Sequence, residues 1–422
     1  MTPISRRSFN ALKAGTVATL AAPAVLAQKT PIKLGVLLPL SGPLATLGND
    51  VLRGFQLAQE WANAEGGVFG QPVEFVVGDV PSSTEAVSQA TRLINKDGVK
   101  VICGSFASSI SLPASQVAER NKVIYFEQGA VADDITKRGF KYLFRMIYPA
   151  TELGAGAAQY ATDVMIPGCG LDLKTAKIAM LTEDSSYGAS VAEGAKAYLA
   201  KKGAKLVDAA SYSYKTTDMS SFVQRYKSME PDIIILCQYA PDAILFARQA
   251  REAGLKFKGM IGTGAGHNVG DFADAIMDDV NGVFNAGTSV YINPKGLTPE
   301  AAALFKRFHV EHPKRFEGRA PSAHTGMGFT AMNLLLKRLL PAAGEMDVEK
   351  IRRAMLATDM PMGSTIVGWG VKFDPITQNN TRAFPTYDQW RSRKIVTIGP
   401  DPFGMDKPVA MPLPDWGKRG AI

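Results

Sequence analysis

Short apolar runs alternate with segments of helical periodicity along most of the chain. The run IKLGVLLPL is predicted to form a buried strand, and residues 51–64 an amphipathic helix that ends before Gly66 and Gly67. A strand at PVEFVVGD, a helix over 83–96, a strand at VKVICGS, a helix over 111–120 and a strand at KVIYFEQGA follow. This order predicts a parallel sheet that is covered by helices on both faces.

The same alternation restarts after residue 148. Its predicted strands are AKIAMLTED, AKLVDAASY, DIIILCQYA and GMIGTGA, with helices between them, so a second α/β lobe is expected. Near residues 282–284 the chain is predicted to return to the first lobe, because the helices expected at 299–312 and 323–340 exceed what the second sheet needs. A helix near 348–356 and a hairpin running from VGWGVKFDP to WRSRKIVTI are predicted to follow.

The predicted fold is therefore α/β, with two doubly wound, Rossmann-like lobes that are joined by several crossings of the chain. Ligands bind to such sheets at the carboxyl ends of the strands, which places a site in the cleft between the lobes. The linking segments can bend as hinges, so the cleft can close over a small molecule. The predicted division is 32–148 for the first part of lobe 1, 149–283 for the first part of lobe 2, 284–365 for the return to lobe 1, and 366–422 for a C-terminal hairpin and tail, mainly in lobe 2.

The first 27 residues have the features of an export signal. Arg6 and Arg7, within SRRSF, resemble the twin-arginine signature, and an apolar, alanine-rich stretch over 14–26 follows that is too short to span a bilayer. The small side chains near its end predict cleavage after Ala27, and the mild hydrophobicity of the stretch favours twin-arginine export. The mature chain is therefore expected in the periplasm. An ordinary N-terminal amphipathic helix is the alternative interpretation.

Composition limits the remaining possibilities. With 422 residues, of which 46% are hydrophobic, the chain can build a large core. Its formal net charge of +8 is spread without a polybasic run, so neither nucleic acid nor a membrane surface is expected as a partner. Cys103, Cys169 and Cys237 are far apart and show no CxxC spacing, so no metal site and no disulfide framework is predicted.

Motifs of the common enzymes on this architecture are missing from the sequence. No GxGxxG or GxxxxGK[ST] follows a predicted strand, no GxSxG elbow occurs, and the histidines form no HExxH motif. The segment GTGAGHN is rich in glycine, but its spacing differs from that of a phosphate-binding loop. We therefore expect a binding protein without catalytic residues, cofactor or metal, and an enzyme on the same architecture is the disfavoured alternative.

Several ordered blocks of the chain resemble one family. The stretch from IKLGVLLPLSGP to PVEFVVGD, together with SFASSISLPAS, DDITKRGFKYLFR, EDSSYGAS and GWGVKFDP, is similar to the leucine/isoleucine/valine-binding family of periplasmic proteins that serve ATP-binding-cassette (ABC) transporters. The resemblance covers nearly the whole mature chain. It implies a type I periplasmic-binding fold with three hinge crossings.

The resemblance also implies a function. A member of this family captures a small carboxylate-bearing solute, here a branched-chain or hydrophobic amino acid or an aromatic or aliphatic acid, and delivers it to a membrane permease while acting as a monomer. A periplasmic sensor that passes its signal to a membrane receptor would use the same closure, and it is the alternative function.

The resemblance places the carboxylate of the ligand on the loop SFASS. Independently of the family, the hydroxyl groups of Ser108 and Ser109 and free backbone N–H groups at the start of a helix form an anion site. Either serine can also be a helix N-cap, which is compatible with ligand contact. By the same resemblance Gly129 and Ala130 line the first wall of the cleft, while Val131 stands where family members often carry a hydroxyl group.

Four further positions match ligand positions of the family. Tyr187 and Tyr239 are expected to close over the ligand from the second lobe, because an aromatic body with a polar tip suits packing and hydrogen bonding. His324 matches a position at the rim of the cleft, and Leu47 one that touches the apolar part of the ligand. Structural roles in the core are the alternative for each of the four.

The most informative departure from the family lies at Gly264. Members that bind amino acids place an acidic residue near this position, where it pairs with the ammonium group of the ligand, but GTGAGH contains none. A buried ammonium group without a counter-charge is costly. Either another acid such as Glu127 or Glu183 replaces the missing one, or the ligand has no ammonium group, which makes an aromatic or aliphatic carboxylate a candidate.

Overall fold

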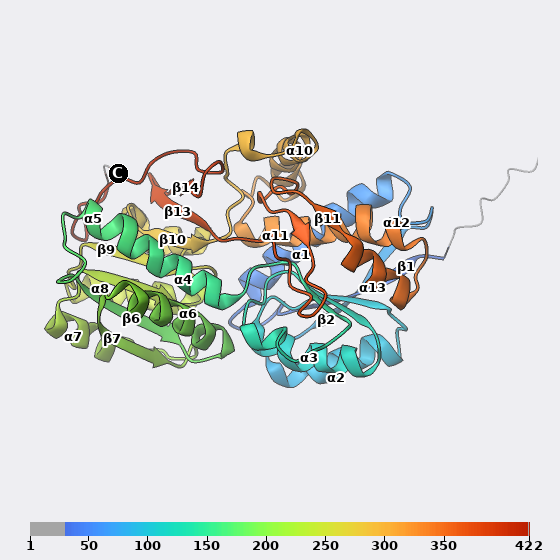
Figure 1. The fold of residues 1–422 in the computed structure, drawn as a ribbon, viewed down its shortest axis with the longest axis horizontal. Helices are drawn as coiled ribbons and strands as arrows, with labels where there is room; N and C mark the ends of the chain where they lie inside the picture. The colour runs from blue at the N-terminus through green and yellow to red at the C-terminus, as the bar shows by residue number, and fades with distance from the viewer. Residues whose placement is uncertain (1–29, 421) are drawn as a thin grey trace, which may run out of the picture.

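The computed structural model describes residues 30–420 and 422. Two lobes lie side by side along the long axis of the molecule (Figure 1). The predicted signal peptide, with its cleavage after Ala27, lies outside the described residues. No helix in the described part of the chain is long and apolar enough to cross a membrane.

Lobe 1 is built on a five-stranded parallel sheet with the order β2-β1-β3-β4-β5. Its central strands are buried on both faces, which explains why they appear in the sequence as uninterrupted apolar runs. Helices α2 and α3 pack against each other on one side of the sheet, and α1 lies on the other side (Figure 1). The strands are β1 (Ile32–Leu38), β2 (Val73–Asp79), β3 (Val101–Gly104), β4 (Ile124–Glu127) and β5 (Leu143–Arg145), and the helices are α1 (Ala45–Ala64), α2 (Ser83–Asn95) and α3 (Ser108–Arg120).

Lobe 2 contains a seven-stranded sheet with the order β14-β13-β10-β9-β8-β6-β7. The strands from β6 to β10 are parallel, and a C-terminal antiparallel hairpin extends one edge. The strands are β6 (Lys177–Glu183), β7 (Lys205–Tyr212), β8 (Ile233–Cys237), β9 (Gly259–Thr263), β10 (Phe284–Gly287), β13 (Thr386–Arg391) and β14 (Lys394–Gly399). The helices are α4 (Ala150–Tyr160), α5 (Ile166–Gly168), α6 (Ser186–Lys202), α7 (Ser220–Met229), α8 (Ala240–Glu252) and α9 (Gly270–Ile276).

The chain passes between the lobes three times. The first passage joins β5 to α4, the second joins β10 to α10, and the third joins β12 to β13. These passages confirm the predicted fold of two doubly wound lobes with a three-crossing hinge. Between the second and third passages lie α10 (Pro299–Arg315), α11 (Ala323–Leu334), α12 (Leu340–Ala343), α13 (Val348–Ala357), β11 (Asp359–Met360) and β12 (Val371–Lys372).

The returning segment packs tightly on lobe 1. Helix α11 lies along α1, and a Cβ atom built on Gly54 of α1 would lie 2.2 Å from the Thr325 carbonyl oxygen. The two backbones therefore touch, and any side chain at Gly54 would push the helices apart. Because the start of α11 faces the gap between the lobes, this close contact fixes the position of the residues that α11 contributes there.

The return to lobe 1 occurs later in the chain than predicted. Strand β10 pairs with β9 through Ala286 and Thr263, so residues 284–287 belong to the second sheet, and the predicted boundary after residue 283 cuts through that sheet. The strand FNAG is short and contains a polar residue and a glycine, so it lacks the continuous apolar run of the other buried strands.

The C-terminal hairpin also differs from the predicted one. Its turn lies at Ser392 and Arg393, where both residues have positive φ angles of 46° and 59°. The hairpin therefore lies wholly within β13 and β14, while VGWGVKFDP contributes only the two residues of β12. Tight hairpin turns usually contain Asn or Gly at such positions, and neither occurs here.

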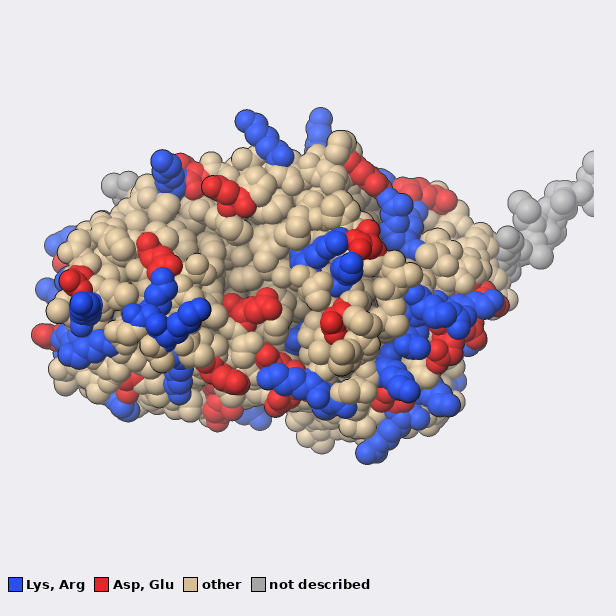
Figure 2. All heavy atoms as spheres, viewed as in Figure 1, with Lys and Arg blue, Asp and Glu red and all other residues tan. Residues whose placement is uncertain are grey.

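Charged side chains of both signs are intermixed over the face that Figure 2 shows, and tan surface separates them. On this face no broad region has a single sign of charge, in agreement with the scattered basic residues of the sequence. Cys103 and Cys237 are buried, Cys169 is half-buried, and all three are free thiols.

Candidate functional site

A cavity lies between the lobes, near the carboxyl ends of the strands. This is the place where two-lobed α/β proteins commonly bind small organic molecules. Lobe 1 contributes loop residues after β3 and β4, the start of α3 and one face of α11. Lobe 2 contributes one residue each from α4 and α6 and loop residues after β8 and β9. The first two crossings contribute Ile147, Tyr148 and Thr288. The cavity therefore has walls from both lobes and from the hinge.

Six of the predicted site residues line this cavity: Ser108, Gly129, Tyr187, Tyr239, Gly264 and His324. The other three do not. Leu47 lies on α1 and is buried in the core, Ala130 turns its backbone N–H toward a buried carboxylate, and Ser109 follows Ser108 on the next position of α3. Contact of any of these residues with a ligand remains a prediction.

Several lining residues were not predicted from the sequence. Phe106 lies in the predicted loop SFASS, and Met327 follows His324 by three positions on α11, so helical spacing was an available signal for it. Tyr148 and Thr288 lie in the crossings, where the hydroxyl groups of the two residues are 3.1 Å apart. The positions of these two residues depend on how the lobes pack together, and a local sequence pattern does not predict this packing.

The start of α3 provides the polar end of the cavity. The N-cap residue is Ala107, so neither Ser108 nor Ser109 is an N-cap as the alternative interpretation suggested. Ser108 Oγ accepts a hydrogen bond of 3.1 Å from the backbone N–H of Ala132, which leaves its own proton free to donate. Within residues 30–420 no acceptor is found for the backbone N–H groups of Ser108 and Ser109. Such groups at a helix start favour an anion.

No Asp, Glu, Lys or Arg among the described residues lines the cavity. The two acids suggested as substitutes for the missing counter-charge are engaged elsewhere. Glu183 accepts hydrogen bonds from Ser185 N, Ser185 Oγ and Gly188 N, and Glu127 is enclosed by backbone N–H groups of its own lobe. Burial raises the pKa of both carboxyl groups. The cavity therefore offers no counter-charge to an ammonium group. The described part of the chain also contains no cluster of acidic, histidine and cysteine side chains suited to a metal ion.

Aromatic rings from both lobes form part of the remaining wall. The rings of Tyr187 and Tyr239 are 5.6 Å apart, and the Tyr187 hydroxyl donates to the Thr263 carbonyl oxygen at 2.6 Å. On the lobe 1 side, Phe106 meets His324 edge to face with the ring centroids 5.0 Å apart. Burial lowers the pKa of His324 to about 4, so the imidazole is neutral at physiological pH. These surfaces suit a flat or branched apolar body.

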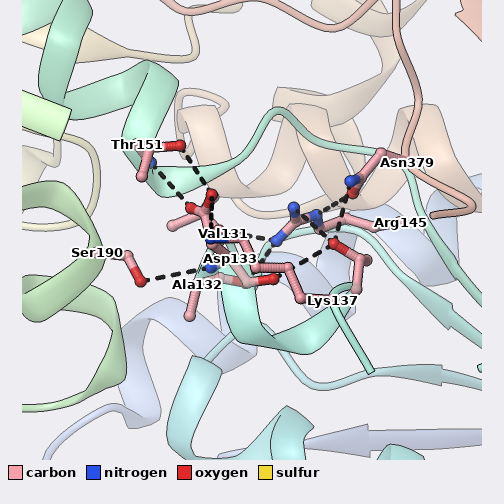
Figure 3. A network of polar contacts seen from close by, with 9 residues as sticks. Val131, Ala132, Asp133, Lys137, Arg145, Thr151, Ser190 and Asn379 are labelled. Carbon is pink, nitrogen blue, oxygen red and sulfur yellow. Dashed lines mark hydrogen bonds and ion pairs between the residues drawn. The ribbon is translucent and has the colours of Figure 1, made fainter. Parts of the chain in front are cut away.

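Direct contacts join the lobes close to Val131, which lines the cavity (Figure 3). The Asp133 carboxylate of lobe 1 accepts hydrogen bonds from Thr151 N at 3.0 Å and Thr151 Oγ1 at 2.8 Å, at the start of α4 in lobe 2. The backbone N–H of Asp133 also donates to Ser190 Oγ of α6 at 3.4 Å. These hydrogen bonds join the two lobes directly.

Arg145 anchors the same loop from behind. Its guanidinium group, which is fully buried, donates to the carbonyl oxygens of Val131 and Ala132 at 2.8 and 2.7 Å and to Asn379 Oδ1 at 2.8 Å (Figure 3). Since Asn379 lies in the third crossing and Arg145 ends β5 at the first, the side chain connects two hinge segments to the cavity wall at Val131.

A buried carboxyl group lies near the hinge in lobe 2. Asp388 of β13 stands opposite Asn285 of β10, and Oδ1 of Asp388 accepts from Thr397 Oγ1 at 3.0 Å. Within the described residues, Oδ2 of Asp388 and both polar atoms of the Asn285 side chain have no hydrogen-bond partner. Burial raises the pKa of Asp388 to about 7. Hydrogen bonding with Thr397, Ser289 and Asn285 opposes this rise.

We expect this group to make stability depend on pH. Between about pH 4 and pH 7 the folded protein holds a proton on Asp388 that the unfolded chain has lost, so the free energy of unfolding falls as the pH rises through this range. The Asp388→Asn variant lacks this titrating group, so it also lacks this pH-dependent contribution to the free energy of unfolding. Its melting temperature relative to wild type should therefore be a few degrees higher at pH 8 than at pH 4.5. Scanning calorimetry at both pH values, with the exposed Asp401→Asn variant as the control, measures the difference, and parallel pH profiles for wild type and Asp388→Asn would contradict the assignment.

Comparison with known proteins shows one consistent similarity. Residues 31–384 match a family model described as periplasmic binding protein. Leu/Ile/Val-binding protein homolog 7 of Brucella suis is 36% identical over 386 residues, which cover 90% of this chain and 94% of the relative.

Solved structures agree with this similarity at the level of the fold. A leucine-binding protein from Thermotoga maritima superposes with a TM-score of 0.74 at 24% identity, over 87% of this chain and 98% of that one. A solute-binding protein of an ABC transporter from R. palustris, solved in complex with benzoate, also has a TM-score of 0.74 at 19% identity, over 91% of this chain and all of that one.

Proposed function

Because the chain belongs to the periplasmic binding protein family of Leu/Ile/Val-binding proteins, we propose that it captures a small carboxylic acid between its lobes and delivers it to a membrane ABC permease. The proposal includes export to the periplasm, one ligand for each monomer, and no turnover of that ligand. The observation that supports a carboxylic acid over an amino acid is the absence of any acidic side chain among the described residues that line the cavity.

The polar groups of the cavity suit a ligand with a single negative end. Ser108 and the N–H groups at the start of α3 can receive a carboxylate, since the helix dipole and the unpaired donors both favour an anion there. An ammonium group at the opposite end would be buried against Tyr187, Tyr239 and Gly264 without a counter-charge. That arrangement is costly, because an isolated charge loses its hydration on burial.

The apolar part of the ligand is then an aromatic ring or an aliphatic chain. The tyrosines of lobe 2 and the Phe106 and His324 rings of lobe 1 offer apolar faces on both sides of the cavity. Similar structures bind leucine in one case and benzoate in another, so the fold accepts both kinds of ligand and the lining decides between them. The lining of this cavity favours the benzoate type.

Calorimetry on the purified mature protein tests the proposal with pairs of ligands that differ only in the ammonium group. We expect 3-phenylpropionate to bind and phenylalanine not to bind, and 4-methylpentanoate to bind where leucine does not. Benzoate against benzamide tests the requirement for a carboxylate. Binding of the amino acids in preference to the acids would refute the ligand class while leaving the family unchanged.

The same titrations test the site. Replacing Ser108 and Tyr239 together by alanine removes one contact from each lobe, and it should weaken binding of the best acid by more than tenfold, which is about 1.4 kcal/mol. The Ser88→Ala variant, on the exposed side of α2, is the control and should bind like wild type. Unchanged affinity in the double variant would remove both residues from the site.

A further inference from the structure

Glu127 is the last residue of β4 and lies beside the end of β3, where both strands feed loops into the cavity. Its side chain is fully buried. The loop after β3 contributes Phe106 to the cavity and leads into Ser108 at the start of α3, and the loop after β4 contributes Gly129 and Val131. A single side chain between these loops is therefore able to act on both.

Five donors converge on the Glu127 carboxylate. Oε2 accepts from Ser105 N at 2.5 Å and from Ser111 Oγ at 2.8 Å. Oε1 accepts from Phe106 N at 3.2 Å and from the N–H groups of Gly129 and Ala130 at 2.8 and 2.9 Å. Two of the backbone donors thus come from the first loop and two from the second, and the hydroxyl comes from α3.

This arrangement changes the predicted anion site. Part of the loop SFASS already points its N–H groups at an anion, and that anion belongs to the protein. Burial raises the pKa of Glu127, whereas the hydrogen bonds from Gly129 and Ala130 oppose the rise. Four of the five partners are backbone N–H groups, which can only donate, so the geometry favours the ionised carboxylate.

We propose that Glu127 is a positioning residue: a resident carboxylate that sets the two lobe 1 loops of the cavity in place and occupies the N–H groups that a ligand would otherwise take. The carboxylate of the ligand is thereby confined to Ser108 and the start of α3. This inference rests on the proposed function for its link to ligand binding, but its internal geometry is independent of any ligand.

The Glu127→Ala variant provides a direct test by chemical rescue. The substitution removes Cγ, Cδ and the two carboxylate oxygens, which together have the composition and shape of acetate. Buried donors left without an acceptor destabilise a protein. We expect Glu127→Ala to melt at a lower temperature than wild type, and acetate in the refolding buffer to restore most of that loss.

Matched controls separate a specific site from a general effect of salt. Acetamide has nearly the same shape without the charge and should not rescue the variant, and neither should chloride at equal ionic strength. Wild type should be indifferent to acetate. Glu127→Gln should be intermediate, because one oxygen remains while the amide nitrogen faces donors, and it is the variant to use where Glu127→Ala does not fold. Equal effects of acetate and acetamide, or a Gln variant with full stability, would overturn the assignment.

Amide chemical shifts supply a readout that general stabilisation would not give. In Glu127→Ala, acetate should shift the backbone N–H signals of Ser105, Phe106, Gly129 and Ala130 together, and with one affinity. Shifts spread over the whole protein, or no shifts at these four residues, would contradict the proposal that their N–H groups bind the Glu127 carboxylate.

Binding measurements then distinguish failure of this inference from failure of the proposed function. With 3-phenylpropionate as the probe, Glu127→Ala should bind at least tenfold more weakly than wild type, and acetate should return the affinity. If wild type binds leucine instead, and Glu127→Ala loses leucine but not 4-methylpentanoate, Glu127 pairs directly with an ammonium group and is not a positioning residue. If no probe binds wild type, the proposed ligand class fails, while the acetate rescue still decides the role of Glu127.

Discussion

Replacing Arg145 by alanine should lower the free energy of unfolding by about 3 kcal/mol or more. The guanidinium group is fully buried and donates to the carbonyl oxygens of Val131 and Ala132 and to Asn379 and Thr136. Alanine would leave several of these acceptors without a donor and would also open a void. Since the contacts join the first crossing, the third crossing and the cavity wall, their loss loosens all three.

Urea unfolding followed by circular dichroism measures this effect. The Arg145→Lys variant is the matched control, because it keeps the positive charge but lacks the planar fork that reaches four acceptors at once. We expect it to recover only part of the lost stability. A change below about 1 kcal/mol in Arg145→Ala, which is within the range of ordinary substitutions, would show that the network is dispensable.

Replacing Asp133 by alanine should weaken ligand binding by at least tenfold without a change in ligand preference. The carboxylate joins lobe 1 to Thr151 in lobe 2 by two hydrogen bonds that are available when the lobes are together, and it does not line the cavity. Hydrogen bonds to a charged acceptor contribute about 1.5–3 kcal/mol each, and 1.4 kcal/mol corresponds to a factor of ten in affinity. The lost hydrogen bonds stabilise the closed form, so their removal weakens the binding of every ligand that requires this form.

Calorimetry against each acid that binds wild type tests this uniformity, and small-angle scattering of the ligand-free protein reports the separation of the lobes. The neighbouring Asp134→Ala variant is the control, because the Asp134 side chain is exposed. A selective loss for one ligand would identify Asp133 as a ligand contact. Unchanged affinity for all of them would show that the Thr151 hydrogen bonds are equally strong in the open form.

Local patterns predicted most of the fold because its strands are buried on both faces. Runs such as IIILC, which forms β8, are apolar throughout and flanked by amphipathic helices, so period and length together identify them. Strand β10 is not predicted from the sequence, because Asn285 and Gly287 interrupt its apolar run. Its pairing with β9 and β13 places it in the sheet. Tertiary pairing, and not local preference, makes that segment a strand.

The site was less predictable than the fold, because a local sequence pattern does not determine the direction in which a side chain points. Leu47 lies on α1 with its side chain in the core, although resemblance alone placed it against the ligand. Glu127 and Glu183 have the charge that an ammonium group needs, yet both face backbone N–H groups of their own loops. Tyr148 and Thr288 reach the cavity only because two crossings meet there.

The contact between α1 and α11 has a consequence for how the protein folds. The face of α1 that packs on α11 stays uncovered until residues 323–334 have been synthesised. Lobe 1 therefore cannot fold completely until most of the polypeptide has left the ribosome. Pairings between distant parts of a sequence slow folding, and an uncovered apolar helix face invites association with other chains. Lobe 2 also waits, because its edge hairpin comes from the last 40 residues or so. Assembly of both halves is therefore completed nearly together, after most of the chain has been synthesised.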